Sequence, residues 1–150
     1  MTSTLFSILS VKLEYHKGRI IVACVASNIL RVQQIFEAAS ANDRKVVLTG
    51  HDAEKIVKTA MRLNKLHLPS DDLLVPLKDI QKYNDDEVVI LETGRSGEPL
   101  KSLQKMALGR HRAVNIHEGD LVFITTTPSH AVETTVAKTR DMIYRAGGTV

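Results

Sequence analysis

Short runs of apolar residues alternate along the chain with longer stretches in which apolar residues recur every three or four positions. The runs cover residues 18–26, 45–50, 87–94 and 120–127, and they are rich in Val and Ile. Runs of this length that are apolar almost throughout are typical of strands buried on both faces of a parallel sheet. We therefore predict a strand at each of the four runs.

A stretch with helical spacing follows each of these strands. The first helix is expected after Ser27 or Asn28, either of which can cap its start, and the second is expected to begin near 51–52. The third opens at 98–99, because proline is well tolerated at the first position of a helix, and the fourth covers about 131–145. The apolar faces expected to be buried are formed by Ile29, Val32, Phe36 and Ala39, by Ile56, Val57, Ala60 and Leu63, and by Val132, Val136 and Ile143.

Strands that alternate with helices form a parallel sheet with both faces covered. One more short strand and helix fit residues 71–84, and no low-complexity linker or repeat divides the chain. We therefore predict a single doubly wound α/β domain over residues 1–150, with a mainly parallel sheet and helices on both faces. The sequence stops at "AGGTV", where glycines close a helix and a new β-type run starts, so we expect a domain excised from a longer chain.

The composition allows one real core and leaves the choice of partner open. Of the 150 residues 43% are hydrophobic and only 4% aromatic, so aliphatic side chains must fill the core. A formal net charge of +3 tolerates anionic partners without requiring them. No apolar stretch reaches the roughly 18 residues of a membrane span, and the first ten residues lack the features of a secretory signal. Cys24, the single cysteine, cannot form an internal disulfide, which favours a cytoplasmic location.

The carboxyl ends of the predicted strands are candidates for a binding site. Ligands of open α/β sheets collect outside these ends, where helix N-termini present free N–H groups. The ends are rich in Ser, Thr, Gly and Asn, which equally suit helix caps, turns and strand ends without any ligand. The three strand ends at 27–31, 94–98 and 125–127 together nevertheless favour a surface that binds an anion. Its candidate residues are Ser27, Asn28, Arg31, Gly94, Arg95, Ser96, Gly97, Glu98, Thr125, Thr126 and Thr127.

Other kinds of site find little support in the sequence. Neither G-x-G-x-x-G nor G-x-x-x-x-G-K-[ST] is present, which disfavours dinucleotide binding and hydrolysis of nucleoside triphosphates. None of the six histidines stands in H-x-H or H-E-x-x-H spacing, so we predict no metal site and no cofactor in this chain, nor any catalytic residue. The segment "LGRHR" (108–112) suits either an anionic partner or a solvated turn, and the turn is slightly favoured.

The chain contains, in order, the segments "GRIIVACVASNILRVQQIFEAA", "RKVVLTG", "VVILETGRSGEPLKSLQKMALGRHRAVNIHEGDLVFITTTP" and "RDMIYRAGGTV". Together they resemble the β-CASP domain of bacterial ribonuclease J. The resemblance extends over about residues 3–150. Its most specific parts are "ASN" before "RVQQ", "TG" with "GEP" close behind, and "GD" leading through a strand to a hydroxyl-rich turn that ends in proline.

The resemblance implies a cytoplasmic enzyme of RNA maturation and mRNA decay, with 5′-to-3′ exonuclease and endonuclease activity. Its two metal ions, zinc or manganese, belong to a metallo-β-lactamase domain whose H-x-H-x-D-H motif is absent from this chain. The β-CASP domain is inserted into that domain and lines the RNA channel, so this chain alone is expected to be inactive. The implied partners are single-stranded RNA with a 5′-monophosphate, a paralogous ribonuclease J subunit and further copies of the protein, and no membrane.

The chain departs from the family pattern in its loops. The family's "FASN" has Val25 in place of phenylalanine, and "GEP" (97–99) follows an Arg-Ser pair at 95–96 where a polar residue and Gln are usual. The segment "TTTPSHAVE" (125–133) stands where the family usually reads "SSSPIPGNE", so Ala and Val replace Gly and Asn at 131–132. These differences resemble the divergent second paralogue of firmicutes, whose members are often weak nucleases that pair with a more active one.

Three functions from different classes therefore remain open. The first is the RNA-binding part of a metal-dependent nuclease, in which "TGRSGEP" shapes the channel and Arg95 approaches a phosphate. The second is a partner-binding or regulatory domain of a weakly active paralogue that supports the active subunit. The third is a stand-alone nucleotide binder, which is the weakest because both glycine fingerprints are missing.

Overall fold

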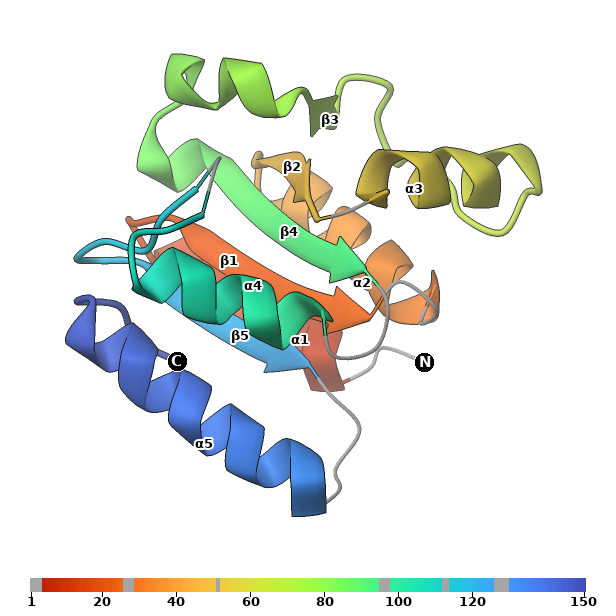
Figure 1. Ribbon diagram of the computed structural model, residues 1–150. Coiled ribbons are helices and arrows are strands. Elements are labelled where there is room, and N and C mark those ends of the chain that lie inside the picture. Colours follow the sequence, from red (N-terminus) through yellow and green to blue (C-terminus); the bar gives the residue numbers. More distant parts are fainter. Residues whose placement is uncertain (1–3, 26–28, 51, 95–97, 112–113, 126–129) are drawn as a thin grey trace.

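A five-stranded parallel sheet forms the centre of the molecule, and helices cover both of its faces (Figure 1). The computed structural model describes residues 4–25, 29–50, 52–94, 98–111, 114–125 and 130–150. The elements are, in chain order, α1 (Thr4–Tyr15), β1 (Ile20–Val25), α2 (Ile29–Ala41), β2 (Lys45–Thr49), α3 (Ala53–Arg62), β3 (Leu74–Val75), the 3₁₀ helices η1 (Leu77–Lys82) and η2 (Asp85–Glu87), β4 (Val88–Gly94), α4 (Glu98–Ala107), β5 (Leu121–Thr125) and α5 (His130–Arg145). The predicted doubly wound α/β fold is confirmed.

The strand order β3-β2-β4-β1-β5 places β4 between the first two strands of the chain. Every pairing is parallel, and Val22 in the middle of β1 lies opposite Leu91 of β4 and Phe123 of β5. Each parallel connection needs a crossover, and the helices provide it. The sheet therefore brings together segments that are about 70 to 100 residues apart in the sequence.

Two hydrophobic clusters, one on each face of the sheet, hold the layers together. Alternate residues of β1 point to opposite faces, so Val22 packs with residues of α1, α2 and α3 while Ile21 packs with residues of α4 and α5. Phe36 on the first face and Leu103 on the second are fully buried. Burial of one such side chain stabilises the fold by about 1.5–3 kcal/mol relative to an exposed one.

Most of the predicted elements are confirmed, with ends shifted by one or two residues. In 71–84 the strand is present as β3, but the helix that follows Pro76 is the 3₁₀ helix η1. Leu63 was predicted on the buried face of the second helix, and this is wrong because it is 61% exposed. The cause is local, since α3 ends at Arg62 and the backbone turns into the left-handed region at Asn64.

Helix α1 was not predicted from the sequence. Leu9 and Leu13 are buried against the sheet, whereas Val11 and Tyr15 between and after them are exposed. Apolar residues therefore occur on both the inner and the outer side of the helix, which blurs the stripe by which an amphipathic helix is found. Only the packing of α1 against α2 distinguishes the two sides.

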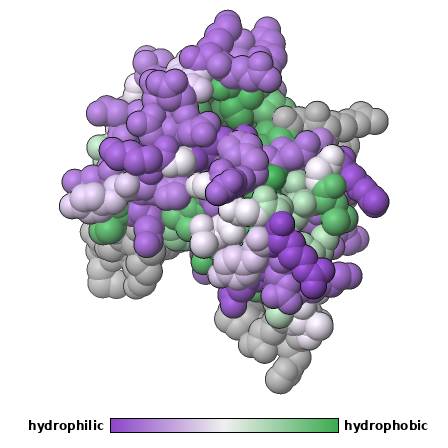
Figure 2. All heavy atoms as spheres, turned by 90° about the vertical axis from the view of Figure 1, so that its left-hand side faces the viewer, coloured by the Kyte–Doolittle hydropathy of each residue, from purple (hydrophilic) through white to green (hydrophobic). Residues whose placement is uncertain are grey.

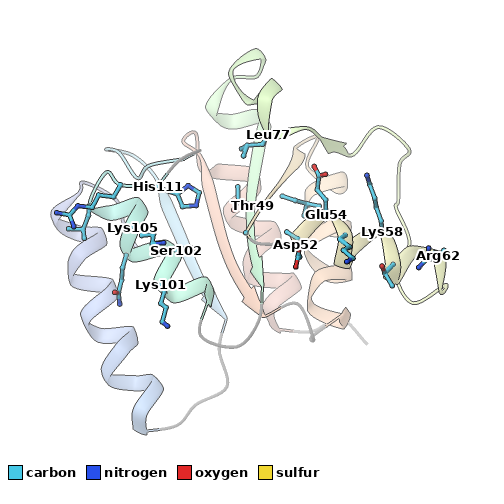
Figure 3. A pocket seen from close by; sticks show the side chains of 18 residues that line it. Thr49, Asp52, Glu54, Lys58, Arg62, Leu77, Lys101, Ser102, Lys105 and His111 are labelled. Carbon is cyan, nitrogen blue, oxygen red and sulfur yellow. The ribbon is translucent and has the colours of Figure 1, made fainter.

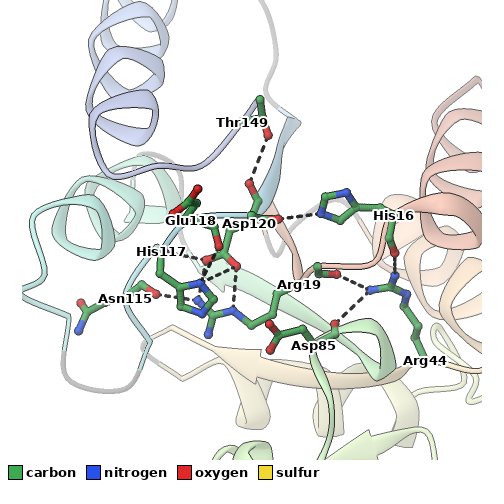
Figure 4. A network of polar contacts seen from close by, with 11 residues as sticks. His16, Arg19, Arg44, Asp85, Asn115, His117, Glu118, Asp120 and Thr149 are labelled. Atoms are coloured by element: carbon green, nitrogen blue, oxygen red, sulfur yellow. Dashed lines mark hydrogen bonds and ion pairs between the residues drawn. The ribbon is translucent and has the colours of Figure 1, made fainter.

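Arg44 ties together the backbone at the amino ends of the strands (Figure 4). Its guanidinium donates to the carbonyl oxygens of Gly18 and Val88, both at 3.1 Å, and to that of Asp85 at 3.5 Å. A further hydrogen bond reaches the carbonyl oxygen of His16. One side chain thus joins the segment before β1, the start of β2 and the start of β4.

The environment of Arg44 is costly for a charge. The side chain is 2% exposed, and burial lowers the pKa of its guanidinium while the charge of Asp86 acts in the opposite direction. A buried cation is tolerated when most of its donors are satisfied. Four carbonyl oxygens accept from the two terminal nitrogens of Arg44, whereas its buried Nε has no hydrogen-bond partner among the described residues. Arg44 therefore belongs to the framework of the fold.

A second arginine closes the same edge next to Arg44 (Figure 4). Arg19 makes a two-pronged ion pair with Asp120, with nitrogen–oxygen distances of 3.0 and 2.6 Å, and also donates to the carbonyl oxygen of Asn115 at 2.7 Å. The carboxylate of Asp120, which is completely buried, accepts a further bond from the backbone N–H of His117 at 2.9 Å. The start of β5 is thereby fixed to the start of β1.

The outer surface at these amino ends is mostly hydrophilic. Figure 2, which views the molecule from the left-hand side of Figure 1, shows apolar residues only in small separate areas. No helix in the described ranges is long and apolar enough to cross a lipid bilayer.

Gly50 marks the opposite end of β2, where the chain passes very close to β4. Its φ is +112°, and a Cβ at this position would stand 2.0 Å from the carbonyl oxygen of Thr93. Both the backbone conformation and the contact therefore require glycine. The "TG" of the sequence is the point at which β2 can leave the sheet without pushing β4 away.

We expect Arg44→Met to lower the free energy of unfolding by about 3 kcal/mol, because the variant leaves buried carbonyl groups without a donor. The quantity is measured by urea denaturation followed by circular dichroism. Arg140→Met on α5, where the arginine is exposed, serves as the control and should change the stability by less than about 0.5 kcal/mol. Equal stability of the two variants would contradict the framework role of Arg44.

We expect Gly50→Ala to destabilise the protein by more than about 2 kcal/mol, because strain and a steric clash with β4 act together. Gly109→Ala is the matched control, since Gly109 also has a positive φ of +72° but a Cβ there would meet nothing within 4 Å. The control should lose only about 1 kcal/mol from backbone strain. Urea denaturation of both variants measures the difference, and similar losses would argue against the clash.

Candidate functional site

The carboxyl ends of the strands, where the sequence places its candidate residues, lie along one edge of the sheet (Figure 1). Strands β1 and β4 end there side by side, with Val25 opposite Gly94. The chain leaves β1 for α2 on one face of the sheet and leaves β4 for α4 on the other face. Connections that leave adjacent strands toward opposite faces mark the place where ligands bind in folds of this type. We call the adjacent ends of β1 and β4, at Val25 and Gly94, the crevice.

A row of three polar side chains crosses the sheet one residue before this crevice. Cys24 of β1 lies opposite both Thr93 of β4 and Thr125 of β5. Because side chains alternate along a strand, all three belong to the face that α2 covers. Thr125 Oγ1 donates to the carbonyl oxygen of Ala23 at 2.9 Å. Thr93 Oγ1 is one of two buried side-chain atoms in the described part of the chain that have no hydrogen-bond partner.

The charge at this row comes from Arg31 and from the start of α2. Burial raises the pKa of the Cys24 thiol, while a hydrogen bond from Thr125 and the positive charge of Arg31 lower it by less. At neutral pH the thiol is therefore uncharged. The first turn of α2 contains no acidic residue, so the positive end of the helix dipole lies uncompensated beside the crevice. These features suit an anionic ligand.

A buried carboxylate lies behind the edge on the other face of the sheet. Glu92 of β4 is opposite Thr49 of β2, and its side chain, 1% exposed, accepts a hydrogen bond from the Thr49 hydroxyl. The pair joins the ends of two strands next to Gly50. Since a carboxylate needs such partners when it is buried, we assign Glu92 to positioning of the strand ends.

The structure places four of the predicted site residues at this edge. Arg31 lies in the first turn of α2, Gly94 ends β4, Glu98 begins α4, and Thr125 ends β5. The backbones of these four residues lie at this edge, and their role as binding residues stays a prediction. Seven further predicted residues lie outside the described ranges: Ser27, Asn28, Arg95, Ser96, Gly97, Thr126 and Thr127.

Sequence reasoning missed the inner part of the edge. Cys24, Thr93 and Glu92 occur inside apolar runs and were assigned to the strands alone. Two signals were available: a carboxylate inside "VVILETG" needs a partner, and period-2 alternation puts Cys24 and Thr125 on one face. The pairing of β4 with β1 could not be predicted, because the sequence of a strand does not specify which other strand it pairs with.

The described residues do not fit a metal ion. Among them, no group of three or more His, Cys, Asp or Glu side chains comes together as potential ligands. The buried carboxylate of Glu92 next to the edge accepts the hydrogen bond of the Thr49 hydroxyl. We therefore derive no metal chemistry from this part of the chain, and the edge is suited to binding.

Comparison with known proteins gives a consistent result. Residues 17–143 match the family described as "Ribonuclease J, beta-CASP domain". Similar curated relatives are named Ribonuclease J 2; one from Streptococcus pyogenes serotype M3 is 59% identical over 133 residues, and others from Staphylococcus epidermidis and Staphylococcus aureus are 40% identical over 131 residues. These alignments cover 89% and 87% of this chain.

The same alignments cover only 24% and 23% of the relatives, so the chain spans about a quarter of their length. The matched residues include all five strands and the edge at which they end. The predicted resemblance is thereby confirmed, and this chain belongs to the β-CASP domain family of ribonuclease J.

Proposed function

We propose that this chain is the RNA-contacting domain of a ribonuclease J and that it holds single-stranded RNA at the carboxyl edge of its sheet. The observation that carries the proposal is the crevice between β1 and β4, with Arg31 and the start of α2 beside it. A phosphodiester backbone carries one negative charge per nucleotide and needs hydrogen-bond donors. Hydroxyl groups, backbone N–H groups at the helix start and one arginine are such donors.

In this proposal the domain binds and orients RNA, and the chemistry takes place elsewhere in the protein. The described residues offer neither a metal-ligand set nor an acid–base pair at the crevice. Hydrolysis is assigned to two divalent metal ions, zinc or manganese, in a metallo-β-lactamase domain of the same protein. The whole protein is then a cytoplasmic 5′-to-3′ exoribonuclease and endoribonuclease, and its preferred substrate has a 5′-monophosphate.

A regulatory role is the second candidate, and two observations favour it. The relatives reported above bear the name Ribonuclease J 2, which fits a second paralogue that supports a more active subunit. The segment "TTTPSHAVE" (125–133) also lacks the Gly and Asn that the family usually has there. Weak RNA binding by the isolated chain together with strong binding to the partner subunit would favour this candidate.

The first test is a fluorescence-anisotropy titration of the chain with 3′-labelled single-stranded RNA at two salt concentrations. One RNA carries a 5′-monophosphate and the other a 5′-hydroxyl. We expect binding that weakens as salt rises, because phosphate contacts release counterions, and tighter binding of the phosphorylated RNA. The absence of binding at high protein concentration would contradict RNA recognition by this domain.

Arg31→Gln and Arg95→Ala test individual phosphate contacts. Each variant is expected to weaken RNA binding and to lower the slope of log K against log salt by about 0.7, the value for one contact to a single strand. Arg140→Gln is the control, because Arg140 lies exposed on α5. An unchanged slope in Arg31→Gln or Arg95→Ala would exclude that residue from phosphate binding.

A further inference from the structure

A wide groove lies between α3 and α4, on the far side of β4 from the crevice described above (Figure 3). Thr49 and Gly50 at the end of β2 form part of its floor, Leu77 of η1 closes one end, and the two helices form its sides. Its volume is about 1650 Å³, which exceeds the roughly 300–1,000 Å³ of a small-molecule pocket. The size indicates an extended ligand.

Positive side chains border this groove on both sides. Lys55, Lys58 and Arg62 come from α3, Lys101 and Lys105 come from α4, and Arg110 follows α4. Asp52 and Glu54 are the only acidic residues among the described lining residues. Six positive and two negative side chains give a local net charge of +4, which exceeds the +3 of the whole chain. The excess positive charge of the molecule is therefore concentrated here.

These positive charges are not used by the fold. None of the six lysines and arginines forms an ion pair or a side-chain hydrogen bond with another described residue. Elsewhere on the molecule the terminal nitrogens of Arg19 and Arg44 donate to carboxylate and carbonyl oxygens of the framework. Like charges gathered without partners repel one another, so an anionic ligand would gain from binding here.

The spacing of these charges suits a chain of phosphates. Lys101 and Lys105 are four residues apart on one helix and Lys55 and Lys58 are three apart on the other, and such neighbours on a helix surface lie about 5–6 Å apart. No Phe, Tyr or Trp side chain lines the described groove, so that the imidazole of His111 is the one ring among the lining residues on which a base could stack. Hydroxyl groups of Thr59 and Ser102 add neutral donors. The groove is therefore equipped to contact a sugar–phosphate backbone without reading its sequence.

His111 at the end of the groove does not contribute a charge at neutral pH. Burial lowers the pKa of its imidazole, and the positive charge of Lys105 lowers it further. Its Nδ1 accepts a hydrogen bond from the backbone N–H of Val114 at 3.1 Å, which holds the ring at the turn after α4. Leu108 and Gly109 form a turn, which agrees with the slightly favoured interpretation of "LGRHR", and Arg110 lines the groove, while the last residue of the segment lies outside the described ranges.

We propose that this groove is a second, sequence-independent contact for RNA, which holds the part of the strand that extends beyond the crevice. The inference rests on the proposed function of the crevice as an RNA site. Both α3 and α4 begin at the carboxyl edge of the sheet, and β4 lies between the two sites. A strand seated at the crevice can pass around the end of β4 and continue along the lysines of both helices.

Two RNA lengths and two double variants test this proposal in the purified chain. The RNAs are about five nucleotides, enough for the crevice alone, and about twenty nucleotides. The groove variant is Lys58→Gln with Lys105→Gln, and the matched control is Lys12→Gln with Lys138→Gln, which are also exposed but lie on α1 and α5. Thermal melting of both variants verifies that the fold is intact.

We expect the groove variant to bind the long RNA about 10- to 30-fold more weakly at about 0.1 M salt, with a salt slope lower by about 1.4 for two lost contacts. Binding of the short RNA should change less than about twofold, and the control variant should change little with either RNA. Equal losses for both RNAs would overturn a separate contact for the extended strand. An unchanged affinity for the long RNA, with the wild type still binding, would overturn the groove and leave the crevice intact.

Two further outcomes are also decisive. If the wild-type chain binds neither RNA, the proposed function and the groove contact both fail. If long-RNA binding is unchanged in the groove variant but poly-glutamate binds the wild type and not this variant, the groove belongs to an acidic protein partner and the RNA assignment is overturned.

Discussion

The parallel pairing of β4 with β1 on one side and β2 on the other determines where the rest of the molecule lies. β4 enters the sheet late in the chain yet occupies its middle, and its helix α4 packs on the face opposite to α2 and α3. The chain therefore leaves β4 toward one face of the sheet, whereas it leaves the neighbouring strands β1 and β2 toward the other face. The crevice next to β1 and the groove next to β2 are two consequences of this one arrangement.

The two edges of the sheet are built differently, and the difference follows from how their polar groups are satisfied. At the amino edge, carbonyl oxygens hold the terminal nitrogens of Arg44, and Asp120 holds Arg19, so that only Arg44 Nε lacks a partner among the buried side-chain atoms described there. At the carboxyl edge, Thr93 keeps a buried hydroxyl without a partner. The lysines of α3 and α4 that border the groove likewise lack partners among the described residues. Stability is thus secured at one edge, which leaves the other available for binding.

Features that depend on neighbouring residues could be predicted from the sequence, and features that depend on distant pairing could not. The four long strands follow from local apolar runs, and the end of α5 follows from Gly147, which has a positive φ of +97°. Helix α1 was not predicted, because the large hydrophobic residues Val11 and Tyr15 lie on its exposed side. The site was predicted as a set of strand ends, and the parallel sheet brings these ends to one edge.

The groove is the clearest case of information that sequence patterns do not carry. Lys58 and Lys105 each resemble an ordinary exposed lysine on an amphipathic helix, and nothing near either residue points to the other. The two lysines come to opposite sides of one groove because β2 passes close to β4 at Gly50. The helices that follow these two strands, α3 and α4, then form the sides of the groove. For the buried Arg44 the same reasoning holds, since "NDRKVV" reads as a solvated turn before a strand.

In the proposed function the crevice and the groove would attract RNA by different physical means, which would suit a domain that accepts many sequences. The crevice would offer Arg31 and the backbone N–H groups at the start of α2, which act at hydrogen-bond distance and therefore depend on the position of one phosphate. The groove offers six flexible cations, whose attraction is long-range and screened by salt. A strand attracted by the groove would remain near the sheet edge while its end searches for the crevice, because a second contact on the same chain acts at high effective concentration. The affinity for RNA would then come from the charges of the groove, and the position of the strand would be set at the crevice. Neither contribution needs contacts to the bases.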